Sequence, residues 1–307
     1  MRQAENSVRI EGILSEVNLE YGSYQKNDKT EECIRGFIKI LVDQTINGIA
    51  TSHEIPVHLY ATKKKKDGAD NPAYTSIERI KNEYLSIAAA GGEEKADRVR
   101  ITGASIRMNE YFGQDQRFVS FPRIIASFVN KIKKEDCQPE ASFNIEMVVA
   151  NKGYKLDNDG VPVEPQTYLI KGIVPQYGGK VDIIEFVCAN ENVTNVVSQY
   201  WNEGDTVKLK GRLNFTSKTE VIVEEVDFGE PTEKRRTINI SELVITGGSQ
   251  APLEGDFAFN RDEISQALAE RKTRLEEQKE KDKNRMKKRM APAPADTTSN
   301  GAFDMGF

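Results

Sequence analysis

Short runs of alternating apolar and polar residues recur through most of the chain. In "CIRGFIKILV" (33–42), the isoleucines and Val42 would face one way, while Arg35, Phe37 and Lys39 face the other. The segments "HEIPVHLYAT" (53–62) and "TVKLKGRLNF" (206–215) alternate in the same way. A period of two residues is typical of half-buried antiparallel strands. The pattern therefore predicts a mainly β protein built from short strands.

Two pairs of segments indicate an internal repeat. "RIEGIL" (9–14) is similar to "LIKGIV" (169–174), and "ADRVRITG" (96–103) is similar to "EGDTVKLKG" (203–211). In each half, a segment with helical periodicity precedes the second motif. These helical segments are 74–89 and 190–201. Self-similarity of this kind is the signature of a duplicated structural unit. We therefore expect two units, each with strands, one helix and then further strands.

The pattern changes after Gly248. A Gly- and Pro-containing linker precedes Asn260, which can cap a helix with Glu263 as its reciprocal partner. The segment 260–290 holds 11 basic and 7 acidic residues, which suits a solvated helix or one that docks on a partner. The Pro-, Ala- and Thr-rich end has too little apolar mass to fold alone. The expected organisation is a first domain over 1–135, a second over 140–248, a linker over 249–259, the charged helix 260–290 and a disordered tail over 291–307.

Composition narrows the classes of function. The net charge of −5 excludes a uniformly basic nucleic-acid binder, although one groove can still be locally basic. With two histidines and three scattered cysteines, the chain offers little for a zinc site, a disulfide framework or histidine catalysis. It contains no recognisable phosphate-binding or catalytic motif. We therefore expect no cofactor, no metal site and no enzymatic activity. We also expect a cytoplasmic protein, because no apolar run approaches the ~20 residues that span a bilayer.

Two features resemble single-stranded DNA-binding proteins of bacteria and phages. The segment "NEGDTVKLKGRLNF" (202–215) is similar to the stretch that follows the helix of an oligonucleotide/oligosaccharide-binding (OB) barrel. The last residues, "AFDMGF" (302–307), are similar to the acidic-hydrophobic tip of that family. The resemblance implies two tandem OB-like barrels, each with one helix, followed by the charged helix and the tail. The tip departs from the family in having one acidic side chain rather than several.

The resemblance also implies where a strand would bind. Nucleic acid lies across strands 2 and 3 of an OB barrel, between the loops that join strands 1–2 and 4–5. Aromatic rings on that face would stack on bases, and cations would contact phosphates. In the first unit the expected residues are Tyr21, Tyr24, Lys26, Arg35, Phe37, Lys39, His58, Tyr60, Lys63, Lys64, Lys65, Arg107, Tyr111, Phe112 and Arg117.

The second unit provides fewer candidates. We expect "PQYGGK" (175–180) to be its 1–2 loop, followed by strand 2, and 154–164 to be a hairpin or long loop. The expected binding residues are Tyr177, Lys180, Lys208, Lys210, Arg212, Phe215 and Lys218. Asp182 and Glu185 on the expected second strand suit phosphate poorly, so the first unit should bind more strongly. We expect Trp201, Phe118 and Phe121 to pack in the core.

The leading hypothesis is a sequence-tolerant single-stranded DNA-binding protein that acts in replication, recombination and repair. By resemblance, its tip (Phe303, Asp304, Met305 and Phe307) would recruit partner proteins, and a phage or bacterial replisome is the expected setting. If a phage encodes the protein, the compartment is the host cytoplasm. RNA remains an open alternative, because nothing in the sequence reports on a 2′-hydroxyl. The other class is a structural or assembly protein that uses OB-like barrels for protein contacts.

Overall fold

The computed structural model describes residues 1–307 except 27–28, 47, 114, 158, 225–231 and 291–307. The side chains of residues 26, 29, 217–224, 232–239 and 285–290 also lie outside the description. The strands are β1 (Asn6–Lys26), β2 (Lys29–Ile46), β3 (Ile49–Thr62), β4 (Arg98–Phe112), β5 (Phe118–Ala126), β6 (Asn130–Ile132), β7 (Glu140–Tyr154), β8 (Tyr168–Pro175), β9 (Val181–Cys188), β10 (Thr206–Glu224) and β11 (Thr232–Gly248). The helices are α1 (Pro72–Glu83), α2 (Ile87–Ala90), α3 (Glu191–Tyr200) and α4 (Arg261–Met290).

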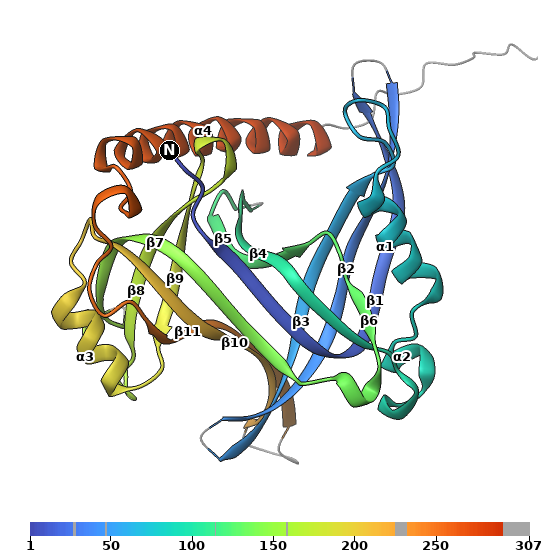
Figure 1. Ribbon diagram of the computed structural model, residues 1–307, viewed down its shortest axis with the longest axis horizontal. Helices are drawn as coiled ribbons and strands as arrows, with labels where there is room; N and C mark the ends of the chain where they lie inside the picture. The colour runs from blue at the N-terminus through green and yellow to red at the C-terminus, as the bar shows by residue number, and fades with distance from the viewer. Residues whose placement is uncertain (27–28, 47, 114, 158, 225–231, 291–307) are drawn as a thin grey trace, which may run out of the picture.

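The first five strands close into a barrel. β1 pairs antiparallel with both β2 and β4, while β2 pairs with β3 and β4 pairs with β5. The pairing of β3 with β5 is parallel and completes the circuit β1-β2-β3-β5-β4. α1 and α2 lie in the connection from β3 to β4 (Figure 1). This is the five-stranded OB-type barrel with its helix between the third and fourth strands.

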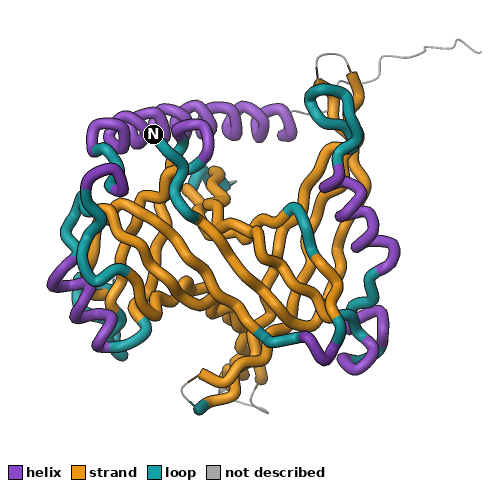
Figure 2. Tube along the Cα trace, in the orientation of Figure 1, coloured by secondary structure: helices purple, strands orange, loops and turns teal. Residues whose placement is uncertain are grey.

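The second barrel repeats the same circuit. β7 pairs with β8 and β10, β8 with β9, and β10 with β11, all antiparallel. The parallel pair is β9 with β11, and α3 lies between β9 and β10. Figure 2 shows the strands at the centre of the molecule and the helices at its periphery. The predicted fold class, mainly β with OB-like barrels and a charged C-terminal helix, is confirmed.

Of the two pairs of segments in the predicted repeat, one matches equivalent strands of the two barrels and the other does not. "ADRVRITG" and "EGDTVKLKG" lead into β4 and β10, each the fourth strand of its barrel. However, "RIEGIL" belongs to the first strand β1, whereas "LIKGIV" is β8, the second strand of its barrel. The first strand there is β7, so 176–180 is the β8–β9 turn and 155–167 is the true 1–2 connection. Alternation reports burial of one face and carries no information on the order of strands.

Alternating residues fill the two barrel interiors. In the first, Ile10, Leu14, Ile38 and Ile40 have no exposed surface, as a strand period of two requires. In the second, the rings of Phe143 and Phe186 lie 5.9 Å apart. Trp201 is buried as expected, and its indole Nε1 donates a hydrogen bond to the Ser249 carbonyl over 3.0 Å.

Each helix begins at a capping side chain. The Asn71 side chain accepts from the Ala73 amide, and Pro72 occupies the first turn of α1. Asn190 caps α3 through the Val193 amide in the same way. Asn260 caps α4 by accepting from the amides of Asp262 and Glu263. Among the described residues, no helix has the length and apolar character needed to cross a membrane.

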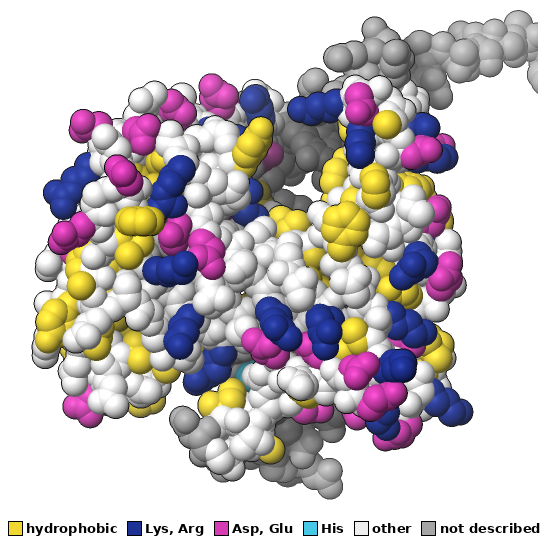
Figure 3. Space-filling view, in the orientation of Figure 1, with side chains coloured by type: hydrophobic (Ala, Val, Ile, Leu, Met, Phe, Trp, Pro, Cys, Tyr) yellow, Lys and Arg dark blue, Asp and Glu magenta, His cyan; other side chains and the backbone are white. Residues whose placement is uncertain are grey.

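The two barrels are joined by strand pairing and by α4. Residues 6–11 of β1 pair with residues 140–145 of β7, so one sheet runs through both barrels. α4 crosses the top of the molecule in Figure 1, from the second barrel toward the first. Ile264 and Ala267, in its first turns, are buried in the core. Below it, the space-filling surface in Figure 3 is hollowed between the second barrel and the β1–β3 strands.

Candidate nucleic-acid interface

Four strands of the first barrel present their outer face as one surface. Arg35 lies opposite Tyr60, and Phe37 lies opposite His58, across the β2–β3 pairing. The register continues onto β5, where Ile125 is opposite His58. It then reaches β4, where Arg107 is opposite Arg123. Because cross-strand partners share a face, these side chains belong to the outside of the barrel.

Aromatic side chains form a row over this surface. The rings of Phe37 and His58 lie 6.1 Å apart, and those of Phe121 and Tyr111 meet edge to face at 6.4 Å. Between the two pairs, the Arg123 guanidinium lies 5.2 Å from the centre of the Phe121 ring. We call Tyr24, Tyr60, Phe37, His58, Phe121 and Tyr111 the aromatic row.

Hydrogen bonding fixes the end of the row at the β1–β2 hairpin. The Tyr24 hydroxyl donates to the Glu31 carboxylate over 2.6 Å. The bond to Glu31, together with one to Tyr60, raises the pKa of Tyr24 well above its usual value. The Tyr24 hydroxyl therefore stays protonated at any physiological pH. Tyr60 remains half exposed, so its ring is accessible to a ligand.

Arg123 differs from the other cations on this face. Arg35 pairs with Glu20 at 2.9 Å, and Lys39 pairs with Glu16 at 2.7 Å. Within the described residues Arg123 has no carboxylate partner, and its Nε is shielded from solvent without a hydrogen-bond acceptor. It lines a groove of about 350 Å³ with Arg35, His58 and Tyr60. An arginine without a carboxylate partner in a groove of aromatic rings is suited to a phosphate.

His58 is held in its neutral form. Burial is the main cause that lowers its pKa below the ordinary value of 6.5, and the positive charge of Arg123 lowers it further. A neutral imidazole at neutral pH adds no charge of its own to the groove. The side chain therefore acts as another flat ring in the aromatic row.

Several predicted residues of the first barrel lie away from the row. Tyr21 faces α1, where its hydroxyl is 3.3 Å from Glu78. Arg107 reaches across to the second barrel and pairs with the nearly buried Asp182 at 2.8 Å. Phe112 packs on Phe118 with ring centres 5.4 Å apart, on the opposite face of the β4–β5 hairpin from Tyr111.

The remaining basic candidates of the first barrel are exposed. Lys63 pairs with Glu32, and Lys64 pairs with Asp70 at 2.6 Å. Lys65 is exposed in the loop after β3. Arg117, at the β4–β5 turn, pairs with Asp115 at 3.2 Å. The side chain of Lys26 lies outside the described residues.

Few candidates of the second barrel lie together. Tyr177 and Lys180 are exposed at the β8–β9 turn, which is not the 1–2 loop that we expected. Lys208 pairs with Glu5, Lys210 is exposed and Arg212 is half-buried on β10. Phe215 is buried, with 6% of its surface exposed, and lies at the junction between the barrels. The side chain of Lys218 and the whole tip, Phe303 to Phe307, lie outside the described residues.

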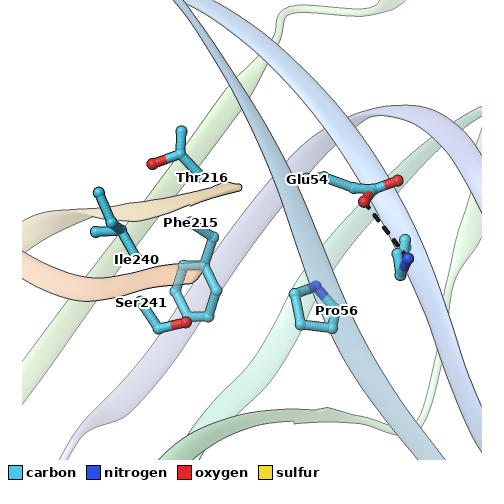
Figure 4. Close-up of a pocket in the computed structure, with 7 residues that line it drawn as sticks. Glu54, Pro56, Phe215, Thr216, Ile240 and Ser241 are labelled. Atoms are coloured by element: carbon cyan, nitrogen blue, oxygen red, sulfur yellow. Dashed lines mark ion pairs between the residues drawn. The ribbon is translucent and has the colours of Figure 1, made fainter. Parts of the chain in front are cut away.

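Figure 4 shows the pocket at that junction. Glu54 and Pro56 approach from β3 of the first barrel, while Phe215 and Thr216 come from β10. The pocket has a volume of about 280 Å³ and also includes Lys39. The β2–β3 face of the first barrel thus ends against the second barrel.

The outer face of β8 and β9 lies across a cleft from the first barrel. A cleft of about 510 Å³ separates Lys171 and Ile183 on this face from Met108 and Phe118 on the β4–β5 hairpin. Arg271 of α4 also lines it. The surface that corresponds to the aromatic row in the second barrel therefore faces the first barrel.

Sequence reasoning missed the contribution of β5. Phe118 and Phe121 were expected in the core, but 46% and 37% of their surfaces are exposed. Ile124 and Ala126 are the buried residues of β5, so the alternate positions Phe121, Arg123 and Ile125 point outward. The alternation in "FPRIIA" (121–126) could have indicated this, because only one register puts Arg123 in solvent.

Comparison with known proteins identifies the family. The model of the YorF family matches residues 4–281, which is most of the chain. The chain belongs to the YorF family. No curated protein matches the sequence of this YorF member.

Solved structures that match the chain include single-stranded DNA-binding proteins. The wild-type protein from Thermus aquaticus has 10% sequence identity and a TM-score of 0.49, and the match covers 85% of this chain and 99% of that one. A deletion mutant of the same protein gives the same identity and TM-score, with 100% of its chain covered. A replication protein A heterotrimer bound to single-stranded DNA gives 8% identity and a TM-score of 0.23, covering 78% of this chain and 49% of that one.

Proposed function

We propose that this YorF-family protein binds single-stranded DNA on the outer face of its first barrel, without catalysis. The observation that carries the proposal is the aromatic row across β2, β3, β5 and β4, with Arg123 at its centre. Rings that lie in a row and stay wholly or partly exposed are suited to stacking on successive bases. Each stacked base contributes about 1–3 kcal/mol, whatever its identity.

The charges on this face favour stacking over a general attraction to phosphate. Arg35 and Lys39 already pair with glutamates, so they bring little net positive charge. A phosphate could pair with Arg123 without breaking an existing ion pair. We therefore assign it the central phosphate contact, with Tyr60 and Phe121 as neighbouring stacking rings.

The second barrel contributes less in this proposal. Its corresponding face lies in the cleft against the β4–β5 hairpin, and Phe215 is buried. Tyr177, Lys180 and Lys210 are exposed, but among the described residues no ring contact connects Tyr177 with the aromatic row. We place the strand on the first barrel and treat the second barrel as a support for it.

The biological setting follows from the sequence resemblance. We propose roles in DNA replication, recombination and repair, in the cytoplasm or in the host cytoplasm if a phage encodes the protein. The tip (Phe303, Asp304, Met305 and Phe307) would recruit partner proteins through its aromatic rings. RNA shares the chemistry of stacking and phosphate contact, so it stays an alternative ligand.

The test is a titration of fluorescein-labelled oligo-dT of about 30 nucleotides and of the matching duplex over a salt series. We expect salt-dependent binding to the single strand and weak binding to the duplex. Arg123→Gln should lower affinity about tenfold and reduce the log–log salt slope by about 0.7. Arg79→Gln on α1 is the control of equal charge. No binding at low salt would reject the proposal and favour the assembly alternative.

A further inference from the structure

The charges of α4 are unevenly distributed along its length. Residues 261–278 hold four basic and five acidic side chains, a net charge of −1. Residues 279–290 hold seven basic and two acidic side chains, a net charge of +5. We call 261–278 the anchored part of α4 and 279–290 its basic end.

The anchored part is tied to both barrels. Ile264 and Ala267 are buried, and the terminal amino group of Met1 pairs with Glu263 at 3.0 Å. Arg271 forms an ion pair with Glu110 of the β4–β5 hairpin, and both side chains are largely buried. The Gln278 amide then donates to the Glu110 carbonyl over 2.8 Å. These contacts fix the direction in which the helix leaves the hairpin.

The basic end starts at the β4–β5 hairpin, on the opposite face from Tyr111, the last ring of the aromatic row. The Lys279 ammonium lies 5.8 Å from the centre of the Phe112 ring, and Phe112 is the neighbour of Tyr111 on β4. Farther along, the described side chains pair within the helix, Lys281 with Glu277 and Lys283 with Glu280. In Figure 1 this end of α4 extends toward the β1–β2 hairpin of the first barrel.

Helix stability alone does not account for this arrangement. Lys279, Lys283 and Lys287 follow one another at intervals of four residues, and Lys281 and Arg285 do the same. Like charges at this spacing destabilise a helix by about 0.2–0.5 kcal/mol per pair. Favourable interaction with the helix dipole is limited to the last turn. A polyanion that lies along the helix would relieve the repulsion over its whole basic end.

We propose that Lys279 and Lys283, in the described start of the basic end of α4, form a second part of the nucleic-acid interface, which binds the phosphates of a strand that continues around the tip of the β4–β5 hairpin. The proposal rests on the function proposed above, since the aromatic row must bring the strand to Tyr111. The anchored part holds the basic end in place before the strand arrives, so little ordering of the helix accompanies binding. A short strand occupies the barrel face, and a longer one also reaches α4.

The experiment compares two lengths of oligo-dT on the full chain. The short one has about 8 nucleotides, within the range of site sizes of one OB barrel, and the long one has about 30, well beyond that range. The test variant is Lys279→Gln with Lys283→Gln. We expect it to bind the long strand about tenfold more weakly and to reduce the salt slope by about 1.4, because two phosphate contacts are lost. Its affinity for the short strand should be unchanged. The matched control, Arg261→Gln with Lys272→Gln, removes the same charge from the anchored part and should bind both strands as the wild type does.

Acetylation of lysines with and without DNA gives a second measurement that needs no variant. Lys279 and Lys283 should be protected by the long strand and remain reactive with the short one. If both lysines stay reactive and the test variant binds the long strand normally, the basic end is not part of the interface, although the barrel face still binds. If the wild type binds neither strand, the proposed function fails, and this inference fails with it.

Discussion

At the residue scale, two adjacent side chains at the tip of the β4–β5 hairpin have different surroundings. Tyr111 and Phe112 looked equivalent in the sequence, as paired rings at a hairpin tip. In the structure Tyr111 meets Phe121 on the outer face, whereas Phe112 packs on Phe118 and lies under Lys279 of α4. The pleat of β4 separates them, because successive side chains point to opposite faces.

Separate alanine substitutions should therefore have different effects. Tyr111→Ala should weaken binding of single-stranded DNA by about 1–3 kcal/mol, the value of one stacked base, and leave stability nearly unchanged. Phe112→Ala should lower the free energy of unfolding, because it removes a packed ring beneath α4. Fluorescence titration and urea denaturation measure the two quantities. Equal loss of affinity in both variants, with no loss of stability, would contradict the separate roles.

Sequence reasoning placed side chains on the same face correctly where two paired strands both alternate between apolar and polar residues. Arg35, Phe37, His58 and Tyr60 share a face because residues 33–46 of β2 pair with the whole of β3 in one register. Arg107 shows the limit of this reasoning. It lies on β4, as expected, but it forms an ion pair with Asp182 of the other barrel, 75 residues away in sequence. Contacts between barrels depend on how the barrels pack, and no local pattern encodes that.

At the element scale, two glycines at the same position of the repeated motif have different surroundings. Gly103 in β4 and Gly211 in β10 occupy the same place in the repeated motif. A Cβ at Gly103 would have open space around it. A Cβ at Gly211 would lie 2.2 Å from the Val244 carbonyl oxygen and 2.3 Å from the Phe143 ring. β10 shifts register at this residue as it closes the second barrel.

Gly211→Ala should therefore destabilise the protein, and Gly103→Ala should not. Overpacking of this kind costs about 1–3 kcal/mol, because the backbone of β11 must move to make room. Urea denaturation followed by circular dichroism measures both variants, with Gly103→Ala as the matched control. An equal change in the two variants would mean that β10 relaxes freely around Gly211.

The alternation of apolar and polar residues could not predict the order of the strands. The segment "LIKGIV" was taken as a first strand because its alternation around a glycine is similar to that of "RIEGIL". β7, the true first strand, carries the same alternation without a central glycine between its apolar positions. Strand number is decided by hydrogen bonding to distant partners, such as β7 with β10. The mainly β class and the two helices between strands needed no such information.

At the scale of the whole molecule, the two barrels form one packed unit. The β1–β7 pairing, the Arg107–Asp182 ion pair and the anchored part of α4 all cross the junction. The buried side chains of both barrels also belong to a single hydrophobic cluster. A strand that binds the first barrel is therefore held by a surface that the second barrel supports.

This arrangement predicts that the barrels unfold together. Trp201 is the one tryptophan of the chain and lies buried in the second barrel, so its fluorescence reports on that barrel. Gly36→Ala perturbs the first barrel, because Gly36 has φ +146° and a Cβ there would lie 2.0 Å from the Asn18 carbonyl oxygen. The urea midpoints from Trp201 fluorescence and from circular dichroism should therefore fall by the same amount. A fluorescence midpoint that stayed at the wild-type value, while circular dichroism showed an earlier step, would mean that the first barrel unfolds on its own. In that case α4 and the β1–β7 pairing would connect the barrels without coupling their stability.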